Sequence, residues 1–289
     1  MIPEAVLAWI VAQGQGVIQS IQPVGGGCIN NGARLQTTTG MSYFLKTNPA
    51  APADMFLREA EGLSALRGDG DSNQEPRLII PRAYLAGDTF LLLEDLNPAK
   101  QTANYWVKFG RRLAHLHQKT SAQFGFAHDN YIGSTPQANP WTNDGHHFFG
   151  NQRLLYQAKL ARKNGLLDTY DFHQVEALCQ RLPELLPPQP ASLIHGDLWS
   201  GNAITNSHGE PAIIDPAAHY GWAEAELAMT TLFDAFPEDF YAAYQEIFHL
   251  EKGFRQRFPI YNLYHLLNHL NLFGTGYLPQ VRSVLHRFA

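Results

Sequence analysis

A change of sequence pattern near residue 100 limits most strongly what this chain can fold into. Residues 16–96 contain short apolar runs, partly β-branched or aromatic, separated by turns such as Gly25-Gly26-Gly27 and Thr39-Gly40. Beyond residue 100, apolar residues recur mostly at helical spacing, with one embedded β segment. The pattern predicts an α+β, bilobal chain: a small antiparallel-sheet lobe, residues 1–96, and a larger, mostly helical lobe, residues 97–289.

The small lobe is expected to have one key helix, Asp54–Leu66, in which Phe56, Leu63 and Leu66 share one face. A short amphipathic helix is expected at the N-terminus. The strands are predicted at residues 16–24, 33–37, 42–46, 76–86 and 89–96. Helices of the large lobe are predicted near residues 106–116, 154–162 and 172–186 and between residues 223 and 289.

Composition and charge exclude several classes of protein. Of 289 residues, 45% are hydrophobic and 12% aromatic, so the chain can bury a sizeable core and is not disordered. The 21 Lys and Arg against 26 Asp and Glu give a net charge of −5, which argues against nucleic acid or an anionic membrane as partner. No run approaches the ~18 apolar residues of a membrane span, and the two distant cysteines favour a reducing compartment. We therefore expect a cytoplasmic protein with no membrane segment.

The strongest chemical signal lies in residues 193–217. The apolar pair Leu193-Ile194 leads into a polar loop that contains Asp197 and, five positions later, Asn202. Two short strand-like runs follow, joined by turn residues at 206–209, so a hairpin should bring Asp215 back beside Asn202. Three oxygen-bearing side chains are therefore expected on one side of a small sheet.

Phosphoryl transfer from ATP needs this set of side chains. A carboxylate orients the acceptor hydroxyl, and an amide and a second carboxylate hold Mg²⁺, which prefers oxygen ligands. We predict Asp197 as the catalytic base, with Asn202 and Asp215 as metal ligands. The kinase pattern H-R-D-L-x-x-x-N fits this loop, with Gly196 in place of the Arg.

A cation on the phosphates is expected from Lys46, which lies in the third predicted strand. On a helical wheel, Glu59 shares the packed face with Phe56 and Leu63, whereas Glu61 points away. A carboxylate on a packed face needs a buried partner. We therefore predict that Glu59, and not Glu61, pairs with Lys46.

Two further segments are assigned to nucleotide binding by their position. Gly25, Gly26 and Gly27 precede the lysine strand, where glycines let backbone N–H groups approach phosphates. The run Leu93, Glu94, Asp95 and Leu96 ends a buried strand where the lobes join, so its backbone is placed to pair with an adenine edge. Cys28, in the glycine turn, is either oxidisable beside cations or an inert filler.

Residues 121–150 have no period and many turn formers, which fits a substrate wall or lid as well as a surface loop. The 13 histidines do not suggest a metal site. None of their pairs, such as His265 and His269, has the acidic or cysteine neighbours of a zinc site.

Taken together, these segments resemble the fructosamine kinase (ketosamine-3-kinase) family, a branch of the protein-kinase-like fold related to aminoglycoside and choline kinases. The resemblance spans nearly the whole chain. It rests on residues 25–29, 44–48, 56–66, 113–117, 124–126, 129–137, 139–141, 195–202, 220–221 and 224–229, with Trp199 as an especially specific residue.

The resemblance implies ATP- and Mg²⁺-dependent phosphorylation of the 3-hydroxyl of a ketosamine, the adduct of a sugar on an amine such as a lysine side chain. The product should eliminate phosphate and free the amine, which is deglycation repair. The resemblance also suggests His195, Trp199, Tyr220 and Glu224 as substrate contacts.

Three places depart from the family pattern and bear on the sugar or amine pocket: Glu226, where Asp is frequent, Ala223, near which a basic residue is frequent, and Gly145-His146-His147, near which a Trp is expected. A kinase of another hydroxylated amine, similar to aminoglycosides or choline, is the alternative enzyme. A nucleotide-binding protein without transfer is the alternative from another class. The sequence leaves open the sugar, the amine and the oligomeric state.

Overall fold

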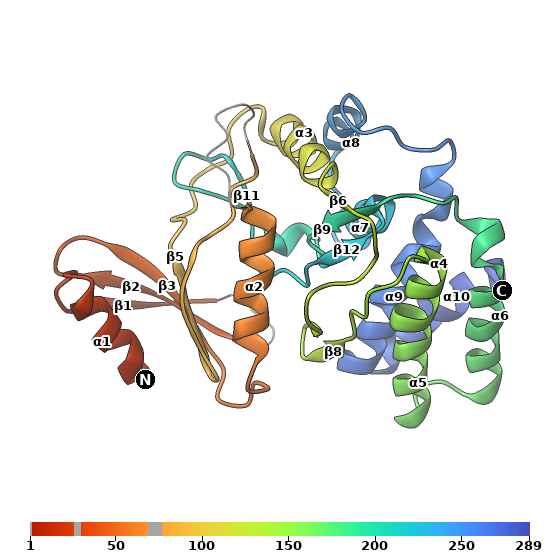
Figure 1. Ribbon diagram of the computed structural model, residues 1–289, viewed down its shortest axis with the longest axis horizontal. Helices are drawn as coiled ribbons and strands as arrows, with labels where there is room; N and C mark the ends of the chain where they lie inside the picture. The colour runs from red at the N-terminus through yellow and green to blue at the C-terminus, as the bar shows by residue number, and fades with distance from the viewer. Residues whose placement is uncertain (1, 26–29, 69–76) are drawn as a thin grey trace.

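A five-stranded antiparallel sheet forms one end of the molecule, and a group of helices forms the other (Figure 1). The computed structural model describes residues 2–25, 30–68 and 77–289. The sheet has the order β1-β2-β3-β5-β4, and two helices pack against it. These elements, called the small lobe below, are α1 (Glu4–Ala12), β1 (Ile18–Val24), β2 (Asn31–Thr37), β3 (Ser42–Thr47), α2 (Met55–Arg67), β4 (Ala83–Gly87) and β5 (Phe90–Glu94).

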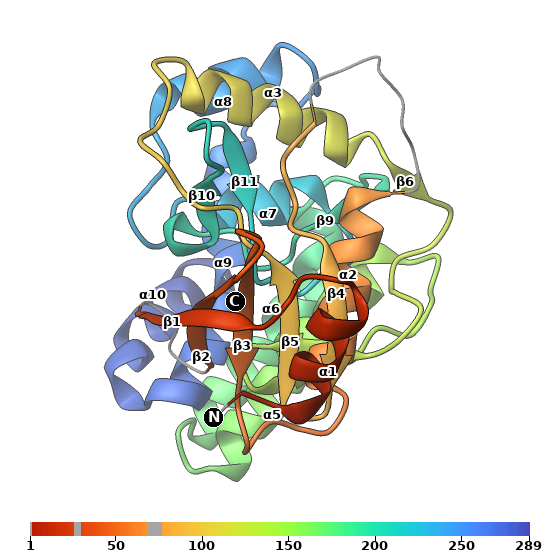
Figure 2. The same ribbon diagram turned by 90° about the vertical axis from the view of Figure 1, so that its left-hand side faces the viewer.

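Along β3, alternate side chains point into the core of the small lobe and to the opposite face of the sheet. Tyr43 and Leu45 are buried in a cluster with Val6 and Ile10 of α1. Phe44 and Lys46 point to the opposite face, where α2 lies. Figure 2 faces this lobe and shows β3 between β2 and β5. The central strand thus presents Lys46 toward the rest of the molecule.

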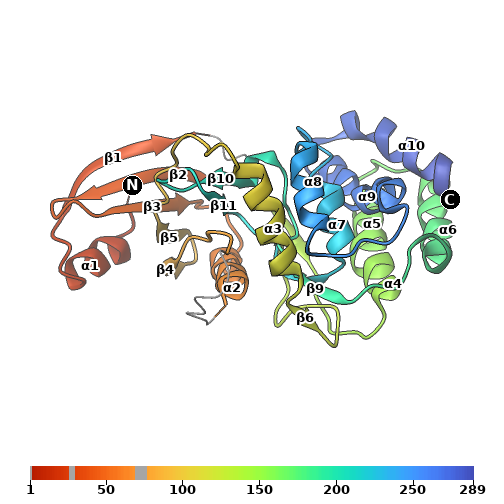
Figure 3. The same cartoon turned by 90° about the horizontal axis from the view of Figure 1, so that it is seen from above.

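The large lobe contains mostly helices, as Figure 3 shows from above. A three-stranded sheet of order β12-β9-β6 lies among them. The elements are α3 (Tyr105–His117), β6 (Thr120–Ser121), β7 (Asn130–Ile132), β8 (Thr135–Gln137), α4 (Gly145–His147), the π-helix η1 (Phe148–Leu155), α5 (Tyr156–Lys163), α6 (Thr169–Leu185), β9 (Ala191–Ile194), η2 (Ser200–Asn202), β10 (Ala203–Thr205), β11 (Pro211–Ile213), β12 (His219–Gly221), α7 (Ala223–Met229), α8 (Glu238–Gln245), α9 (Phe254–Phe273), η3 (Thr275–Tyr277) and α10 (Leu278–Phe288).

The hairpin β10–β11 ties the two lobes together. Ile79, in the segment between α2 and β4, donates its N–H to the carbonyl of Pro211 (3.1 Å) and accepts from the N–H of Ile213 (3.0 Å). The N–H of Ala99 donates to the carbonyl of Asn206 at the hairpin turn (3.1 Å). The predicted α+β bilobal architecture and the predicted hairpin are confirmed.

Several predicted boundaries were wrong. The strand expected over residues 76–86 is confined to β4, and the next one ends at Glu94. Residues 121–150 contain the β7–β8 hairpin and the start of a helical region, rather than only loop. The short helices and strands there carry too few apolar residues to show a period. Within the described parts of the chain, no helix combines the length and apolar character of a membrane span.

Candidate active site

A cleft of about 410 Å³ lies between the lobes, a volume suited to a small-molecule ligand. Both lobes contribute to its walls. Of the residues predicted to bind or react, those that line it are Gly25, Lys46, Glu59, Leu93, Glu94, Asp95, Leu96, Asp197, Trp199, Asn202 and Asp215. Gly26, Gly27 and Cys28 lie outside the described residues.

Lys46 lies between two carboxylates. Its Nζ is 2.5 Å from Oε1 of Glu59 on α2 and also contacts Oδ1 of Asp215. Burial opposes the charge on the ammonium, but Asp215 and Glu59 together raise the pKa of Lys46 above its ordinary value. The predicted pair of Lys46 with Glu59 is confirmed; Glu61 instead contacts Arg58 (2.7 Å).

Asp197 and Asn202 face the cleft from one loop. The Nδ2 of Asn202 donates to the main-chain carbonyl of Asp197 (2.8 Å) and reaches its Oδ2 at 3.3 Å. The N–H of Ile214 donates to the carbonyl of Asn202 (3.1 Å), which places Asp215 beside it. The hairpin therefore brings the three oxygen-bearing side chains together, as the sequence predicts.

The surroundings of Asp197 raise the pKa of its carboxyl group. Burial and the neighbouring charge of Asp215 raise the pKa of Asp197 to about 7, against the hydrogen bond from Asn202. A base with a pKa close to the working pH is the efficient choice for accepting a hydroxyl proton.

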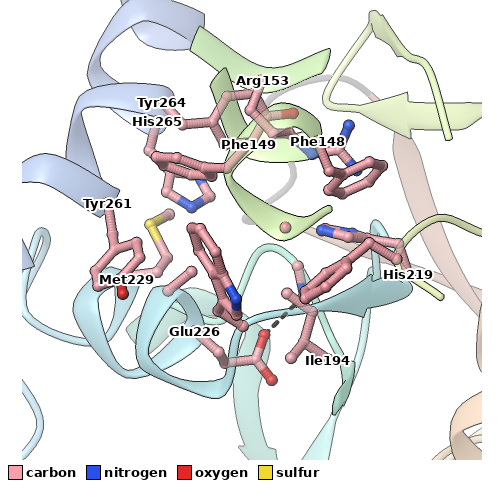
Figure 4. Close-up of a pocket in the computed structure, with 16 residues that line it drawn as sticks. Phe148, Phe149, Arg153, Ile194, His219, Glu226, Met229, Tyr261, Tyr264 and His265 are labelled. Atoms are coloured by element: carbon pink, nitrogen blue, oxygen red, sulfur yellow. Dashed lines mark hydrogen bonds between the residues drawn. The ribbon is translucent and has the colours of Figure 1, made fainter. Parts of the chain in front are cut away.

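Glu226 anchors the loop that carries Asp197. Its two carboxylate oxygens accept the backbone N–H groups of His195 (2.9 Å) and Gly196 (2.7 Å; Figure 4). His117 Nε2 lies 3.1 Å from Oε1 of the same carboxylate. Glu226 thus lies under the loop of residues 195–202, which the sequence predicts to be the catalytic loop, and not among the residues that line the cleft. The structure therefore links its departure from Asp to the geometry of this loop.

His195 is fully buried and links the loop to the hairpin. Its Nε2–H donates to the carbonyl of Ile214 (2.8 Å), and its Nδ1 accepts the N–H of Asp197 (3.2 Å). These bonds assign the neutral Nε2–H tautomer, and burial lowers the pKa of His195. The structure does not bring His195 into the cleft, so a direct substrate contact is not supported.

Tyr220 and Glu224 are also absent from the residues that line the cleft. Glu224 is buried in an ion pair with Arg257 (2.5 Å) and accepts from Tyr261 Oη (3.2 Å). The ring of Tyr220 lies 6.1 Å from that of Trp141. Trp199 does line the cleft, with its ring 6.2 Å from that of Phe233.

Side chains at the junction of the lobes form hydrogen bonds and an ion pair that the sequence does not predict. Asp95 accepts from Ser42 Oγ (2.5 Å) and pairs with Arg34 Nε (2.6 Å), and Glu94 Oε2 accepts the N–H of Arg82 (3.1 Å). These bonds fix the backbone that the sequence places near an adenine edge.

Other residues line the cleft without a sequence motif to mark them. Arg58 of α2 and Asn130 and Tyr131 of β7 line the cleft. Arg58 adds a positive charge beside Glu59, although it is itself paired with Glu61. Arg58 directly precedes Glu59 in the sequence, but on a helical wheel it lies about 100° from Glu59 and nearly opposite Phe56, so the wheel did not mark it.

The donor set fits a hard cation bound together with phosphates. Among the described residues, no group of three or more His, Cys, Asp or Glu is placed to hold a metal ion. Asn202 and Asp215 both line the cleft, so an amide and a carboxylate lie together on its wall. Mg²⁺ is commonly held by one or two such ligands plus substrate phosphates and water.

Comparison with known proteins finds relatives that match nearly the whole chain. Residues 3–289 match the family model described as fructosamine kinase. The chain is 44% identical over 272 residues to a probable ketoamine kinase of Synechocystis, covering 93% of this chain and 90% of that protein. It is 39% identical over 297 residues to the chloroplastic protein-ribulosamine 3-kinase of Arabidopsis thaliana, covering 99% and 87%. The crystal structure of a candidate fructosamine-3-kinase from Thermobifida fusca matches with a TM-score of 0.86 at 32% identity, covering 98% and 97%.

Proposed function

Because the chain belongs to the fructosamine kinase family, we propose that it phosphorylates the 3-hydroxyl of a ketosamine with ATP. In this proposal, residues 1–96 bind the nucleotide and residues 97–289 supply the catalytic and substrate-binding groups. The observation that supports it best is the meeting of Lys46, Asp197, Asn202 and Asp215 in one cleft. Such a site works mainly by positioning and by stabilising charge on the transferred group.

Each polar residue of the cleft has a role in this scheme. Asp197 orients the 3-hydroxyl and accepts its proton, for which its raised pKa suits it. Lys46 binds nucleotide phosphates and is held by Glu59. The backbone of Glu94 to Leu96 pairs with the adenine, and Gly25 with its neighbours covers the phosphates.

Asn202 and Asp215 are the residues that would hold Mg²⁺, and the ion would neutralise charge on the phosphates. In the structure, the pair of Asp215 with Lys46 uses Oδ1 of the carboxylate.

The substrate side is assigned to the region around Trp199. An aromatic face beside a catalytic carboxylate suits a sugar carried on a cationic amine. Phosphorylation next to the ketone carbon creates a leaving group, so the product would release the amine and reverse glycation. The relative from Arabidopsis is named for ribulosamines, which makes ribulosyl-lysine the first substrate to test. We place this repair reaction in the cytoplasm, in keeping with the free thiol of Cys179.

The test is Mg·ATP-dependent ADP release with ribulosyl-lysine and fructosyl-lysine, beside choline and an aminoglycoside. We expect turnover of a ketosamine and loss of at least 100-fold in kcat for Asp197→Asn, with nucleotide affinity nearly unchanged. Activity only on choline or the aminoglycoside would support phosphoryl transfer but reject ketosamines as the substrate class. ADP binding without transfer to any acceptor would reject the proposal that the protein is a kinase.

A further inference from the structure

The β7–β8 hairpin lies between the helix that carries Glu59 and the segment that follows Asp215. Its strands pair antiparallel, with Asn130 opposite Gln137. Both of these side chains are buried, at 5% and 1% exposure. The donors and acceptors of a buried amide need hydrogen-bond partners within the protein. The partners of Asn130 and Gln137 therefore show which segment the hairpin holds in place.

Both amides bind main-chain carbonyls just after Asp215. The Nδ2 of Asn130 donates to the carbonyl of Ala218 (2.8 Å), and the Nε2 of Gln137 donates to the carbonyl of Ala217 (3.1 Å). The N–H of Ala217 in turn donates to the carbonyl of His195 (2.9 Å). Residues 217–218 are therefore clamped between the hairpin and the catalytic loop.

The amides are themselves fixed by further bonds. Asn130 Oδ1 accepts from Gln137 Nε2 (2.7 Å) and Asn139 Nδ2 (3.0 Å). Tyr264 Oη donates to Gln137 Oε1 (2.6 Å), and Arg153 of η1 donates to Asn139 Oδ1 (2.6 Å). Figure 4 shows Arg153 and Tyr264 side by side at one edge of a buried cavity. This chain of bonds leaves the two amides one orientation.

The other side of the hairpin contacts α2. Tyr131 Oη donates to Oδ1 of Asp54, the residue just before α2 (2.6 Å). Gly62 of α2 faces the segment after Asp215, since a Cβ built on Gly62 would lie 3.4 Å from Pro216 and 3.3 Å from Ala218. The hairpin thus contacts α2, which carries Glu59, and also the segment that follows Asp215. Glu59 and Asp215 are the two carboxylates that bind Lys46.

Asp215 needs such a support, because its backbone has φ of +59°. A residue with a side chain enters this left-handed region only when its surroundings hold it there. The carbonyls bound by Asn130 and Gln137 are three and two residues further along, respectively, close enough to set the direction of the Asp215 side chain.

We propose that Asn130 and Gln137 are positioning residues, which hold residues 215–218 so that Asp215 presents its carboxylate to the metal and phosphates. The proposal rests on the proposed function for the role of Asp215. It gives residues 121–150 a task besides forming a wall of the cleft, because the hairpin sets the geometry of a metal-binding carboxylate.

The experiment compares Asn130→Ala and Gln137→Met with Asn262→Ala. Asn262 is a matched control, since it is buried to 6% exposure and its Nδ2 bonds Thr231 Oγ1 (3.3 Å), outside the cleft. ADP affinity is measured by calorimetry with and without Mg²⁺, and amide hydrogen exchange is followed in the peptide that covers residues 215–218. Thermal midpoints report the loss of stability in each variant.

We expect the two hairpin variants to reduce the Mg²⁺-dependent gain in ADP affinity at least tenfold, to leave metal-free ADP binding within twofold, and to speed exchange at residues 215–218. Asn262→Ala should lower the thermal midpoint without either change. If the hairpin variants only lose stability, as the control does, the proposal is overturned. Tyr264→Phe keeps the ring and removes the hydroxyl that donates to Gln137. It is the milder variant if the other two do not fold, and we expect a smaller shift in the same direction.

These measurements use no ketosamine, so the two proposals can fail separately. A wild-type protein inactive on every ketosamine would reject the proposed function, while the ADP and exchange data would still decide the role of the hairpin. If wild-type ADP binding does not respond to Mg²⁺, the positioning role is rejected.

Discussion

The Nζ of Lys46 lies 2.5 Å from Oε1 of Glu59, so a strand and a helix of the small lobe share one buried ion pair. Glu59→Gln should remove one of the two carboxylate partners of Lys46 and leave Asp215 as the other. We expect kcat/KM for ATP to fall about 10- to 100-fold, the range of about 1.5–3 kcal/mol for a bond between charged groups.

Glu61→Gln is the control for this change, because Glu61 lies on the same helix but pairs with Arg58. Its effect on kcat/KM should stay within about threefold, as for a partly exposed ion pair. Equal losses in the two variants would mean that Glu59 acts only through the stability of α2.

Glu226 should matter for the chemical step although it does not touch the cleft. In Glu226→Gln, the amide group faces a backbone N–H of the catalytic loop, at His195 or Gly196, and one buried donor loses its acceptor. That costs about 1–3 kcal/mol. We expect kcat to fall about 5- to 100-fold and the thermal midpoint to drop by a few degrees, with the KM for ATP nearly unchanged.

Glu246→Gln provides the comparison, because its pair with Arg111 is half-exposed on both sides. Exposed pairs contribute about 0–1 kcal/mol. Steady-state kinetics and thermal melts of both variants check the prediction. A Glu226→Gln enzyme with wild-type kcat would show that the loop keeps its shape without this anchor.

Buried neutral histidines should make the fold sensitive to acid. Burial lowers the pKa of His265 to about 3 and that of His219 well below its ordinary value (both in Figure 4). The unfolded chain binds protons on both rings below a pH of about 6.5, and the folded chain does not. Their contribution to stability is therefore complete above this pH and is lost as the pH falls, by about 1.4 kcal/mol per pH unit for each ring.

Chemical denaturation between pH 7.5 and 5 tests this directly. His265→Leu should make the decline in the free energy of unfolding shallower by about 1.4 kcal/mol per pH unit below 6.5. An unchanged slope in His265→Leu would mean that this ring takes up its proton without unfolding.

The sequence was sufficient where a local pattern determines the direction of a side chain. The position of the third predicted strand placed Lys46, the apolar face of one helix placed Glu59, and a turn at residues 206–209 placed Asp215 beside Asn202. Each of these depends on periods of two or 3.6 residues or on a short turn, which a single sequence displays.

The partners of side chains that act through long-range contacts could not be predicted from the sequence. Glu224 and Glu226 are two positions apart on one short helix, yet one binds Arg257 and the other the catalytic loop. Asn130 and Gln137 bind carbonyls 80 or more positions away. No local pattern indicates which buried acid or amide meets which distant backbone group, because tertiary packing decides it.

Close packing of α3 on α8 leads to a prediction about Gly110. A Cβ on this residue would lie 2.2 Å from the carbonyl oxygen of Phe240 and 3.0 Å from the N of Tyr244, both main-chain atoms of α8. Gly110→Ala gains up to about 1 kcal/mol of helix propensity. It must also push a helix aside, and overpacking of this kind costs about 1–3 kcal/mol or more. We therefore expect a net loss of stability, seen as a lower urea midpoint. Gly276→Ala is the control, since nothing lies within 4 Å of its Cβ position, and its midpoint should stay near that of the wild type. If Gly110→Ala is as stable as Gly276→Ala, α8 can shift to make room for the added methyl group, and the close packing of α3 on α8 is not required for stability.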